Sequence, residues 1–202
     1  MTLPMTKFSI NAAPSTDVWR KPPSTFSFNA PTAKTVKGPL KSFKRARLTV
    51  ILPHSSELVK YDQGGILVSV VYPGQEPENA QWLKSGIEYY LDQPWLGTVG
   101  CDRWADWSIS PIVRTKPTLT PTATIELERT VEDGQTSLWL YSIVPGSNRI
   151  PLREATWFFA EEDSDDYEIS LSAYAARPTK KEGNEEEELQ VDFENFEVEW
   201  LE

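Results

Sequence analysis

The sequence has few of the residues that build metal and disulfide sites: among 202 residues there is one cysteine and one histidine. The single Cys101 excludes a disulfide within the chain, so the cysteine content gives no indication of an oxidising compartment. His54 and Cys101 together cannot form a His/Cys metal cluster, and no glycine-rich phosphate loop is present. We therefore expect no metal and no other cofactor, with His54 in a loop and Cys101 packed as a small apolar residue.

Long apolar runs are missing as well. No stretch approaches the roughly 18 consecutive apolar residues that a membrane-spanning helix needs. The opening MTLPMTKFSINAAP contains one lysine and lacks the apolar run typical of a secretion signal. We expect a cytoplasmic protein without a membrane partner.

Basic residues are the minority, and they are unevenly placed. The formal net charge is −10, yet residues 1–60 contain ten Lys and Arg against two Asp and Glu, whereas residues 151–202 contain four against seventeen. A protein that is acidic overall repels phosphates, which argues against a nucleic-acid partner. We expect the two ends to pair, with the basic face of FKRARLTV opposite the acidic face of FENFEVEW.

Proline and alternation are what the chain has in quantity. Sixteen prolines punctuate it, and between them apolar and polar residues mostly alternate, which is typical of short antiparallel strands. No long helical period competes with this pattern. We predict strands at 42–52, 65–72, 81–91, 95–101, 105–112, 122–131, 136–144, 151–160, 166–175 and 190–201, with turns at 62–65, 73–79, 91–94, 132–135 and 145–148.

About ten short strands joined by regular turns predict a single all-β domain over residues 1–202. Its architecture should be a jelly-roll sandwich of two antiparallel sheets. Residues 11–41 are rich in Pro, Ser and Thr, and we expect them to wrap the sandwich as an extended N-terminal arm. Residues 178–188, PTKKEGNEEEE, should form a charged, mobile loop.

One predicted strand, QWLKSGIEYYL, carries isolated polar residues among apolar ones. Its alternation places Trp82, Lys84, Gly86, Glu88 and Tyr90 on one face. At about 3.3 Å per residue, Lys84 and Glu88 lie roughly 13 Å apart, too far for an ion pair along the strand. Between them Gly86 leaves a gap of the kind that a ligand or another backbone approaches. We predict a small polar site here; the alternative is a plain solvent face whose charges pair with adjacent strands.

The site should draw on neighbouring segments. Asp106 could join the surface of Lys84 and Glu88, and aromatic rings could stack against a ligand whose hydroxyl groups these polar residues hold. Lys84 and Glu88 are also the candidate catalytic residues. The candidate binding residues are Tyr61, Gln63, Trp82, Lys84, Glu88, Tyr90, Trp104, Asp106, Trp139 and Tyr141.

Several motifs together resemble a known family. YDQGGILV, WLKSGIEY and ADWSISP, with WRKPP and the closing VDFENFEVEW, are similar to the fungal proteins described as regulators of enolase. These belong to a wider family of unknown-function domains with the concanavalin A-like lectin/glucanase fold. The resemblance covers nearly the whole chain and implies the same sandwich. The polar residues that match the motifs are Tyr61, Asp62, Gln63, Lys84, Glu88, Asp106, Trp107 and Ser108.

An acidic cluster, EEDSDDYE, has the residue spacing of the catalytic carboxylates in glucanases of this fold. Glycoside hydrolysis needs one carboxyl group with a raised pKa. No apolar residue separates Glu161, Asp163 and Asp166 to desolvate one of them. We therefore predict a solvated turn and not a hydrolytic centre.

Three functions are left open. The first is a protein that binds a carbohydrate or another small polar metabolite on its concave sheet, with a regulatory role in carbon metabolism. The second is a regulatory module that binds a metabolic enzyme through its acidic carboxy-terminal region or its proline-rich arm. The third is a metal-independent lyase, isomerase or cyclase in which Lys84 or Glu88 acts as general acid or base. We rank binding first, the protein partner second and catalysis third.

Overall fold

Strands make up most of the chain that the structure, a computed structural model, describes: residues 7–75, 79–113, 119–146 and 149–201. They are β1 (Lys7–Ala12), β2 (Val18–Lys21), β3 (Thr25–Phe28), β4 (Thr32–Pro39), β5 (Phe43–Ile51), β6 (Gln63–Val71), β7 (Gln81–Tyr90), β8 (Gln93–Cys101), β9 (Ala105–Pro111), β10 (Thr122–Glu132), β11 (Gln135–Ile143), β12 (Ile150–Ala155), β13 (Glu168–Ala176) and β14 (Leu189–Trp200). Two short 3-10 turns, Leu40–Ser42 and Ser55–Glu57, complete the regular structure. Within these residues no helix is long and apolar enough to cross a membrane.

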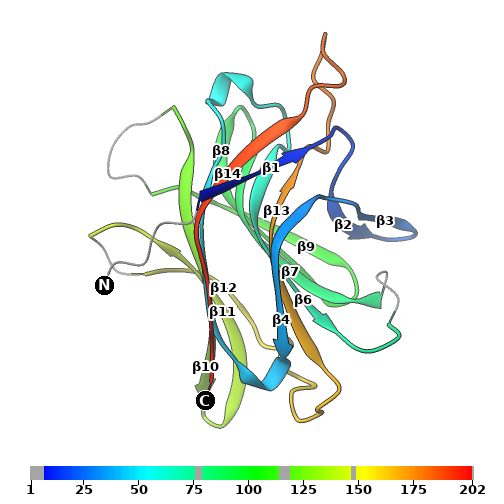
Figure 1. Cartoon of the computed structure of the whole chain (residues 1–202), viewed down its shortest axis with the longest axis vertical. Coiled ribbons are helices and arrows are strands. Elements are labelled where there is room, and N and C mark those ends of the chain that lie inside the picture. Colours follow the sequence, from blue (N-terminus) through cyan, green and yellow to red (C-terminus); the bar gives the residue numbers. More distant parts are fainter. Residues whose placement is uncertain (1–6, 76–78, 114–118, 147–148, 202) are drawn as a thin grey trace.

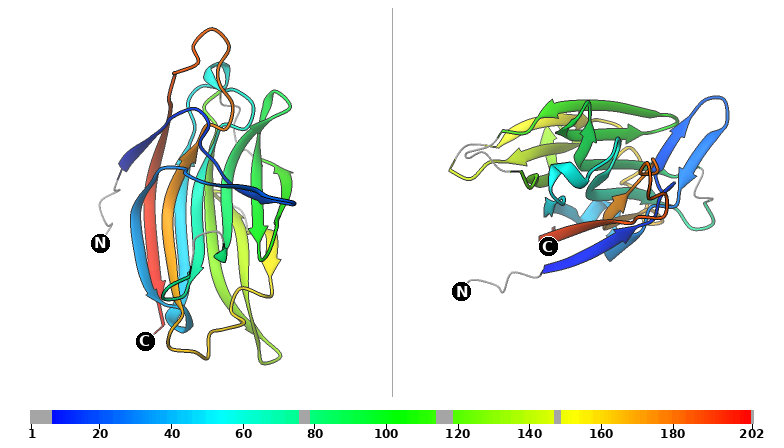
Figure 2. Two further views of the ribbon diagram at one scale, coloured as in Figure 1. Left: turned by 90° about the vertical axis from the view of Figure 1, so that its right-hand side faces the viewer. Right: turned by 90° about the horizontal axis from the view of Figure 1, so that it is seen from above.

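Two six-stranded antiparallel sheets face each other, as predicted. Sheet 1 has the order β1-β14-β5-β10-β11-β12, and sheet 2 has the order β4-β13-β6-β7-β8-β9. Figure 1 views this sandwich from the side, with β10, β11 and β12 on the left and β4, β6 and β7 on the right; Figure 2 turns it to show the two layers. The chain is therefore an all-β sandwich, as the alternation indicated.

The core lies between the sheets and follows from the period of two. In β7, Leu83 and Ile87 point inward and are buried against residues such as Leu48 and Val50 of β5. Fully burying one such side chain contributes roughly 1.5–3 kcal/mol. The alternate residues of β7 therefore lie on the outer face of sheet 2, away from this core.

The segment 11–41 does more than wrap the sandwich. It forms the hairpin β2-β3, which packs on the outer face of sheet 2, and β4, which pairs with β13 and becomes an edge strand. Arg20 of the hairpin donates hydrogen bonds to the backbone oxygens of Ala80 and Asp102 at 3.2 and 3.1 Å. The sequence pattern did not indicate these strand pairings, because the segment is rich in proline and its strands are very short.

A second apolar cluster joins the hairpin to sheet 2. Its buried members are Val18, Leu67, Trp82, Val99, Cys101 and Tyr174. Trp82 is fully buried there, and its ring meets that of Phe28 edge-on at 6.3 Å between centroids. The hairpin therefore covers much of the outer face of sheet 2. A sheet face that was open to solvent would not bury these residues.

Nine of the ten predicted strands lie within two residues of their observed ends. The first four strands, β1 to β4, were not predicted as strands, and β12 ends at Ala155 because residues 156–163 form turns, although Phe158 and Phe159 still enter the core. The predicted turn at 62–65 lies largely within β6. The acidic cluster 161–168 is a turn, as expected.

The remaining turn predictions divide into two groups. The turns at 91–94 and 132–135 are confirmed, with positive φ at Asp92 and Asp133 that suits tight hairpins. Those at 73–79 and 145–148 include residues outside the described ranges.

The two charged ends pair as expected. In the register of β14 with β5, Glu197 stands opposite Arg47 and Glu199 opposite Arg45, and Arg45 forms an ion pair with Glu199. Arg47 turns instead to Glu126 of β10, whose side chain is 1% exposed. The charge gradient along the chain therefore stabilises the outer face of sheet 1.

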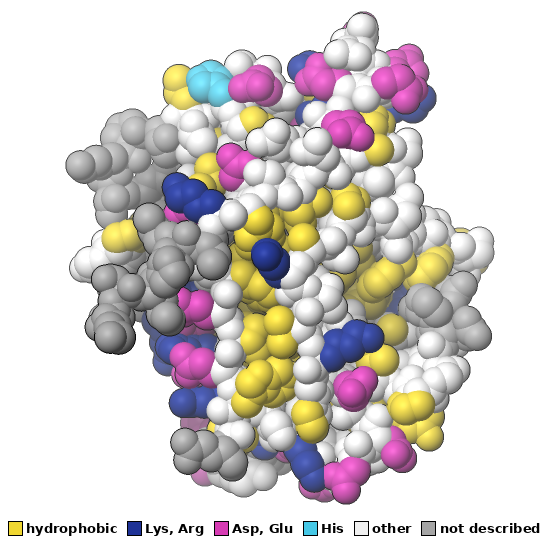
Figure 3. Space-filling view, in the orientation of Figure 1, with side chains coloured by type: hydrophobic (Ala, Val, Ile, Leu, Met, Phe, Trp, Pro, Cys, Tyr) yellow, Lys and Arg dark blue, Asp and Glu magenta, His cyan; other side chains and the backbone are white. Residues whose placement is uncertain are grey.

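Apolar side chains also reach the surface. On the side where β4 and β14 lie toward the viewer in Figure 1, the space-filling view shows a band of them running between the two sheets (Figure 3). Trp200 at the end of β14 covers Gly38 of β4, where an added Cβ would lie 2.6 Å from the indole ring. The two sheets thus close against each other at this edge.

Candidate functional site

The register of sheet 2 lines up a row of glycines under the predicted polar site. Gly65 of β6 pairs with Gly86 of β7, which pairs with Gly97 of β8. A Cβ on Gly86 would lie 2.0 Å from the backbone oxygen of Gly64, so the two strands approach too closely for a side chain. The row leaves a shallow floor between Lys84 and Glu88.

The β2-β3 hairpin turns this floor into a cavity. Its volume is about 260 Å³, and its wall is formed by Asp17, Trp19, Lys21, Tyr61, Gln63, Lys84, Glu88 and Trp107. Asp17 directly precedes the hairpin, and Trp19 and Lys21 belong to its strand β2. The other residues come from sheet 2 and from the loop before β6. The alternative of a plain solvent face is thereby excluded, because Lys84 is only 4% and Glu88 only 8% exposed.

Lys84 links the roof of the cavity to its floor. Its Nζ lies 3.0 Å from Oδ1 of Asp17 and 2.8 Å from Oε1 of Gln63. Gln63 Oε1 also accepts a hydrogen bond of 3.2 Å from the hydroxyl of Tyr174. Burial, with the nearby charges of Glu88 and Asp17, raises the pKa of Tyr174 well above its usual value, so this hydroxyl stays a donor.

Glu88 is the titratable group of the cavity. Burial raises its pKa to about 7; the ammonium group of Lys84 pulls the pKa down and the carboxylate of Asp17 pushes it up. The indole N–H of Trp107 lies beside its carboxyl group and lowers this pKa slightly. Trp107 Nε1 is itself buried, and it makes no hydrogen bond of ordinary geometry to a described residue, so its contact with Glu88 falls short of one.

Aromatic rings close one side of the cavity. Tyr61 stacks on Tyr90 with 5.6 Å between ring centroids, and Trp107 meets Tyr90 edge-on at 5.1 Å. The ammonium group of Lys60 lies 4.7 Å from the centroid of the Tyr61 ring. These rings give the cavity a rigid apolar wall beside its polar floor.

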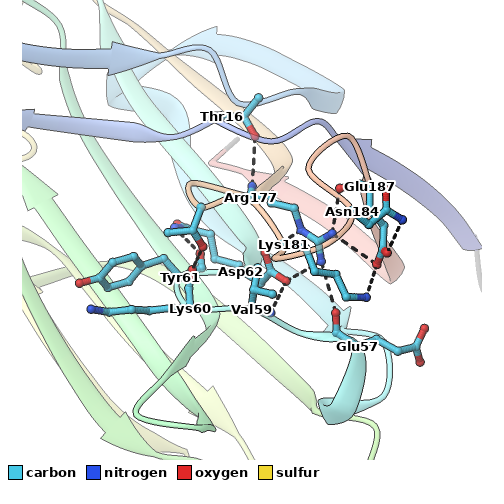
Figure 4. A network of polar contacts seen from close by, with 12 residues as sticks. Thr16, Glu57, Val59, Lys60, Tyr61, Asp62, Arg177, Lys181, Asn184 and Glu187 are labelled. Atoms are coloured by element: carbon cyan, nitrogen blue, oxygen red, sulfur yellow. Dashed lines mark hydrogen bonds and ion pairs between the residues drawn. The ribbon is translucent and has the colours of Figure 1, made fainter.

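A buried ion pair holds the loop that supplies Tyr61. Tyr61 has a left-handed backbone with φ of 71°, which is uncommon for a residue other than glycine. The next residue, Asp62, accepts hydrogen bonds from Nε and Nη2 of Arg177 at 3.0 and 2.7 Å and from the backbone N–H of Val59 at 2.9 Å (Figure 4). Asp62 is 0% and Arg177 1% exposed. The pair fixes the turn that precedes β6.

Arg177 also reaches the roof and the charged loop. Its backbone N–H donates to Oγ1 of Thr16 at 3.0 Å, directly before Asp17, and its side chain donates to the backbone oxygen of Glu187 at 2.9 Å (Figure 4). Lys181 and Asn184 bind the carboxylate of Glu187. The base of the loop 178–188 is therefore tied to Arg177, and its mobility stays a prediction.

Six of the ten candidate binding residues are not part of the cavity wall. The prediction that Asp106 shares the face of Lys84 is wrong, because Val99 of β8 pairs with Lys84 on one side and with Trp107 on the other. Asp106 points to the opposite face and pairs with Arg153. The other five are Tyr90, stacked on Tyr61; Trp82, buried under the hairpin; Trp104, 37% exposed; and Trp139 and Tyr141, stacked on sheet 1 with Arg149 over Tyr141.

The structure adds residues that the sequence pattern did not single out: Asp17, Trp19, Lys21, Tyr174 and Arg177. The alternation of Asp17, Trp19 and Lys21 could have indicated a strand face, but the strand is too short to stand out. Trp107, which the sequence offered only as part of a family motif, lies beside Val99 on the face of Lys84. Among the described residues no cluster of three His, Cys, Asp or Glu could hold a metal ion.

The close packing at the floor of the cavity can be tested by adding a side chain to one of its glycines. A Cβ on Gly97 would lie 2.8 Å from Oε2 and 3.2 Å from Cβ of Glu88. We expect Gly97→Ala to displace the Glu88 carboxyl group and to lower the free energy of unfolding by about 1–3 kcal/mol, measured by urea denaturation.

The matched control is Gly100→Ala on the same strand, where the nearest atoms lie at an ordinary 3.4 Å. Its effect should stay within about 0.5 kcal/mol. Equal losses in the two variants would contradict the close packing of Glu88 on Gly97.

Comparison with known proteins supports the fold and gives no function. The family model "Protein of unknown function (DUF1349)" matches residues 3–200. An uncharacterized protein of Emericella nidulans is 44% identical over 179 residues, which cover 88% of this chain and 80% of that protein.

One solved structure with a TM-score above 0.5 supports the sandwich. A functionally unknown protein from Saccharomyces cerevisiae has a TM-score of 0.61 and 22% identity, and the alignment covers 96% of this chain and 88% of that one. An alginate lyase from Klebsiella pneumoniae has a TM-score of 0.43 at 10% identity, over 79% of this chain and 60% of that one. The enolase connection stays a prediction. By the match over residues 3–200, the chain belongs to the DUF1349 family of proteins of unknown function.

Proposed function

We propose that the protein binds a small polyhydroxylated metabolite, about the size of a monosaccharide, in the cavity between the β2-β3 hairpin and sheet 2. One observation carries this proposal: the Glu88 carboxyl group and the indole N–H of Trp107 are buried side by side at the cavity, and the contact between them falls short of an ordinary hydrogen bond. Buried polar groups are almost always paired, so groups left open at a cavity suit a ligand that pairs with them.

The other polar groups add capacity for hydroxyl groups. Lys84 has three N–H donors and uses two, and the side-chain amide of Gln63 donates one N–H to the backbone oxygen of Tyr61 and keeps another. A hydroxyl group both donates and accepts, so it can bridge these donors and the Glu88 carboxylate. Trp19, Tyr61 and Trp107 offer apolar surface to the carbon skeleton.

The volume limits the size of the ligand. At about 260 Å³ the cavity is smaller than the roughly 300–1,000 Å³ of pockets that hold drug-sized ligands. A single sugar ring or a linear polyol is therefore a better match than an oligosaccharide.

Calorimetric titration with glucose, glucitol, gluconate and glucuronate tests the proposal. The wild-type protein should bind at least one of these probes, and Trp107→Phe should weaken that binding roughly tenfold, because a hydrogen bond worth about 1–3 kcal/mol is lost while the aromatic ring is kept. The control is Trp104→Phe, which alters an exposed indole outside the cavity. Absence of binding by all four probes at millimolar concentration, or equal weakening in both variants, would contradict the proposal.

Catalysis at the same cavity is the second candidate. It is favoured by the pKa of Glu88, which at about 7 suits a general acid or base at neutral pH. Incubating the same probes with the protein and recording proton NMR spectra distinguishes the two functions. New resonances that depend on Glu88 support an isomerase or lyase, whereas unchanged probes that bind support a binding protein.

A further inference from the structure

We infer that the ligand of this cavity is a polyhydroxylated carboxylate, a sugar acid, whose carboxylate accepts hydrogen bonds from Lys84, Gln63 and Trp107. Glu88 in its neutral form donates a further hydrogen bond to the same group. The inference deepens the proposed function and depends on it.

The balance of hydrogen-bonding groups is the first argument. The donors available at the cavity are one N–H each on Lys84 and Gln63 and the indole N–H of Trp107, which lies beside Glu88 without an acceptor at ordinary geometry. Oδ1 of Asp17 is already engaged by Lys84 and by the backbone N–H of Val18. A carboxylate is a pure acceptor with about four lone-pair sites, so it can accept several of these donors at once, which one hydroxyl group cannot.

Charge is the second argument. The cavity wall carries two ammonium groups, Lys21 and Lys84, against the carboxylate of Asp17, and Lys60 lies over the adjoining Tyr61 ring. With Glu88 neutral, the wall has a net positive charge that a monoanion balances. A cationic ligand would instead meet three lysines, although the aromatic wall by itself could hold a cation.

The state of Glu88 decides how the anion fits. The groups that face it are Lys84 on its own strand, Asp17 and Lys21 from the hairpin, Tyr61 from the loop before β6, Tyr174 from β13 and Trp107 from β9. Because its pKa is about 7, protonation of Glu88 costs little at neutral pH and more as the pH rises. An ionised Glu88 would repel a bound carboxylate, so binding of the acid should be accompanied by uptake of a proton.

The experiment compares acids with neutral probes of the same carbon number between pH 6 and pH 8.5. Affinities of gluconate and glucuronate, with glucitol and glucose as the neutral counterparts, are measured by calorimetry in buffers of different ionisation enthalpy. For the wild-type protein we expect an acid to bind at least tenfold more tightly than its neutral counterpart at pH 6. That affinity should fall about tenfold between pH 6 and pH 8, with close to one proton taken up per bound acid at pH 8 and about a tenth of a proton at pH 6.

The decisive variant is Glu88→Gln, whose amide N–H donates at every pH. It should flatten the pH profile and bind the acid more tightly than the wild-type protein at pH 8, by about tenfold. A residue with only a structural role would lose affinity at all pH values. Glu128→Gln on sheet 1 is the matched control and should retain the wild-type profile.

The outcomes separate this inference from the proposed function. Tighter binding of glucitol or glucose than of the acids overturns the inference and leaves the proposed function standing. An acid that binds without proton uptake, or with the same pH profile in Glu88→Gln, also overturns it. If none of the four probes binds, the inference and the proposed function are both contradicted.

Discussion

Replacing Arg177 with methionine is expected to lower the free energy of unfolding by about 3–5 kcal/mol. The change leaves the carboxylate of Asp62, which is fully buried, without the guanidinium group that pairs with it. Burial already raises the pKa of Asp62 even with Arg177 in place, so the cost of burying this charge is only partly offset. Methionine keeps much of the volume, and the loss therefore reports the unpaired charge more than a cavity.

Urea denaturation of Arg177→Met, Asp62→Asn, the double variant and a surface control separates these contributions. Lys180→Met breaks an exposed pair with Glu185 and should cost no more than about 1 kcal/mol. In the double variant, Arg177→Met with Asp62→Asn, the buried charge is gone while an acceptor for the Val59 N–H remains, so part of the stability should return. Additive losses in the double variant would contradict the view that the unpaired carboxylate is the cause.

The Arg177 variant should also bind ligand less well, because Asp62 holds the turn that carries Tyr61 and leads into Gln63. This loss should persist at temperatures where the variant is fully folded by circular dichroism. Wild-type affinity in the folded variant would mean that the ion pair stabilises the fold without positioning the cavity wall.

The second large effect concerns stability against pH. Glu88→Gln is expected to stabilise the protein at pH 8 and to change its stability little near pH 4.5. The folded protein holds a proton on Glu88 up to a pKa of about 7, whereas the unfolded chain loses it near the usual value of 4.5. Wild-type stability contributed by this group is therefore complete below about pH 4.5 and is lost as the pH rises to about 7, by roughly 3 kcal/mol in total.

The difference between wild-type and variant unfolding free energies, measured in urea at each pH from 4.5 to 8.5, isolates Glu88 from the other titrating groups. The gain at pH 8 should be about 3 kcal/mol, because the pKa of about 7 already includes the attraction between Glu88 and Lys84 that glutamine gives up. Glu128→Gln should run parallel to the wild-type curve. A Glu88→Gln curve that also runs parallel would show that Glu88 does not hold its proton to neutral pH.

The face shared by Lys84 and Glu88 could be predicted because the side-chain period of a strand is two, whatever its neighbours are. For other strands, the residues that share this face could not be predicted, since they depend on strand register and on the sheet that each strand joins. A slip of one residue exchanges Asp106 for Trp107, and nothing in ADWSISP indicates which of the two stands beside Val99. Trp139 and Tyr141 share a face, as alternation requires, but alternation does not tell which sheet a strand joins.

The β2-β3 hairpin over the cavity and the ion pair between Asp62 and Arg177 could not be predicted from the sequence for a different reason. The strands of the hairpin span only Val18–Lys21 and Thr25–Phe28, too few residues for a period to emerge among prolines. Arg177 precedes the charged stretch PTKKEGNEEEE and therefore looks solvated in sequence, whereas folding brings it within hydrogen-bonding distance of residues more than a hundred positions away. Buried charges of this kind are specified by tertiary structure and leave no local pattern.

The pairing of β4 with β13 has a consequence for chain integrity. β13 is almost wholly buried, while β4 presents Lys34, Lys37 and Pro39 along the free edge, which are features that discourage another strand from adding to a sheet. β4 thus shields an apolar strand that would otherwise template aggregation. A protease cut or truncation that detached the chain before residue 40 would remove the roof of the cavity and also leave a sandwich prone to self-association through β13.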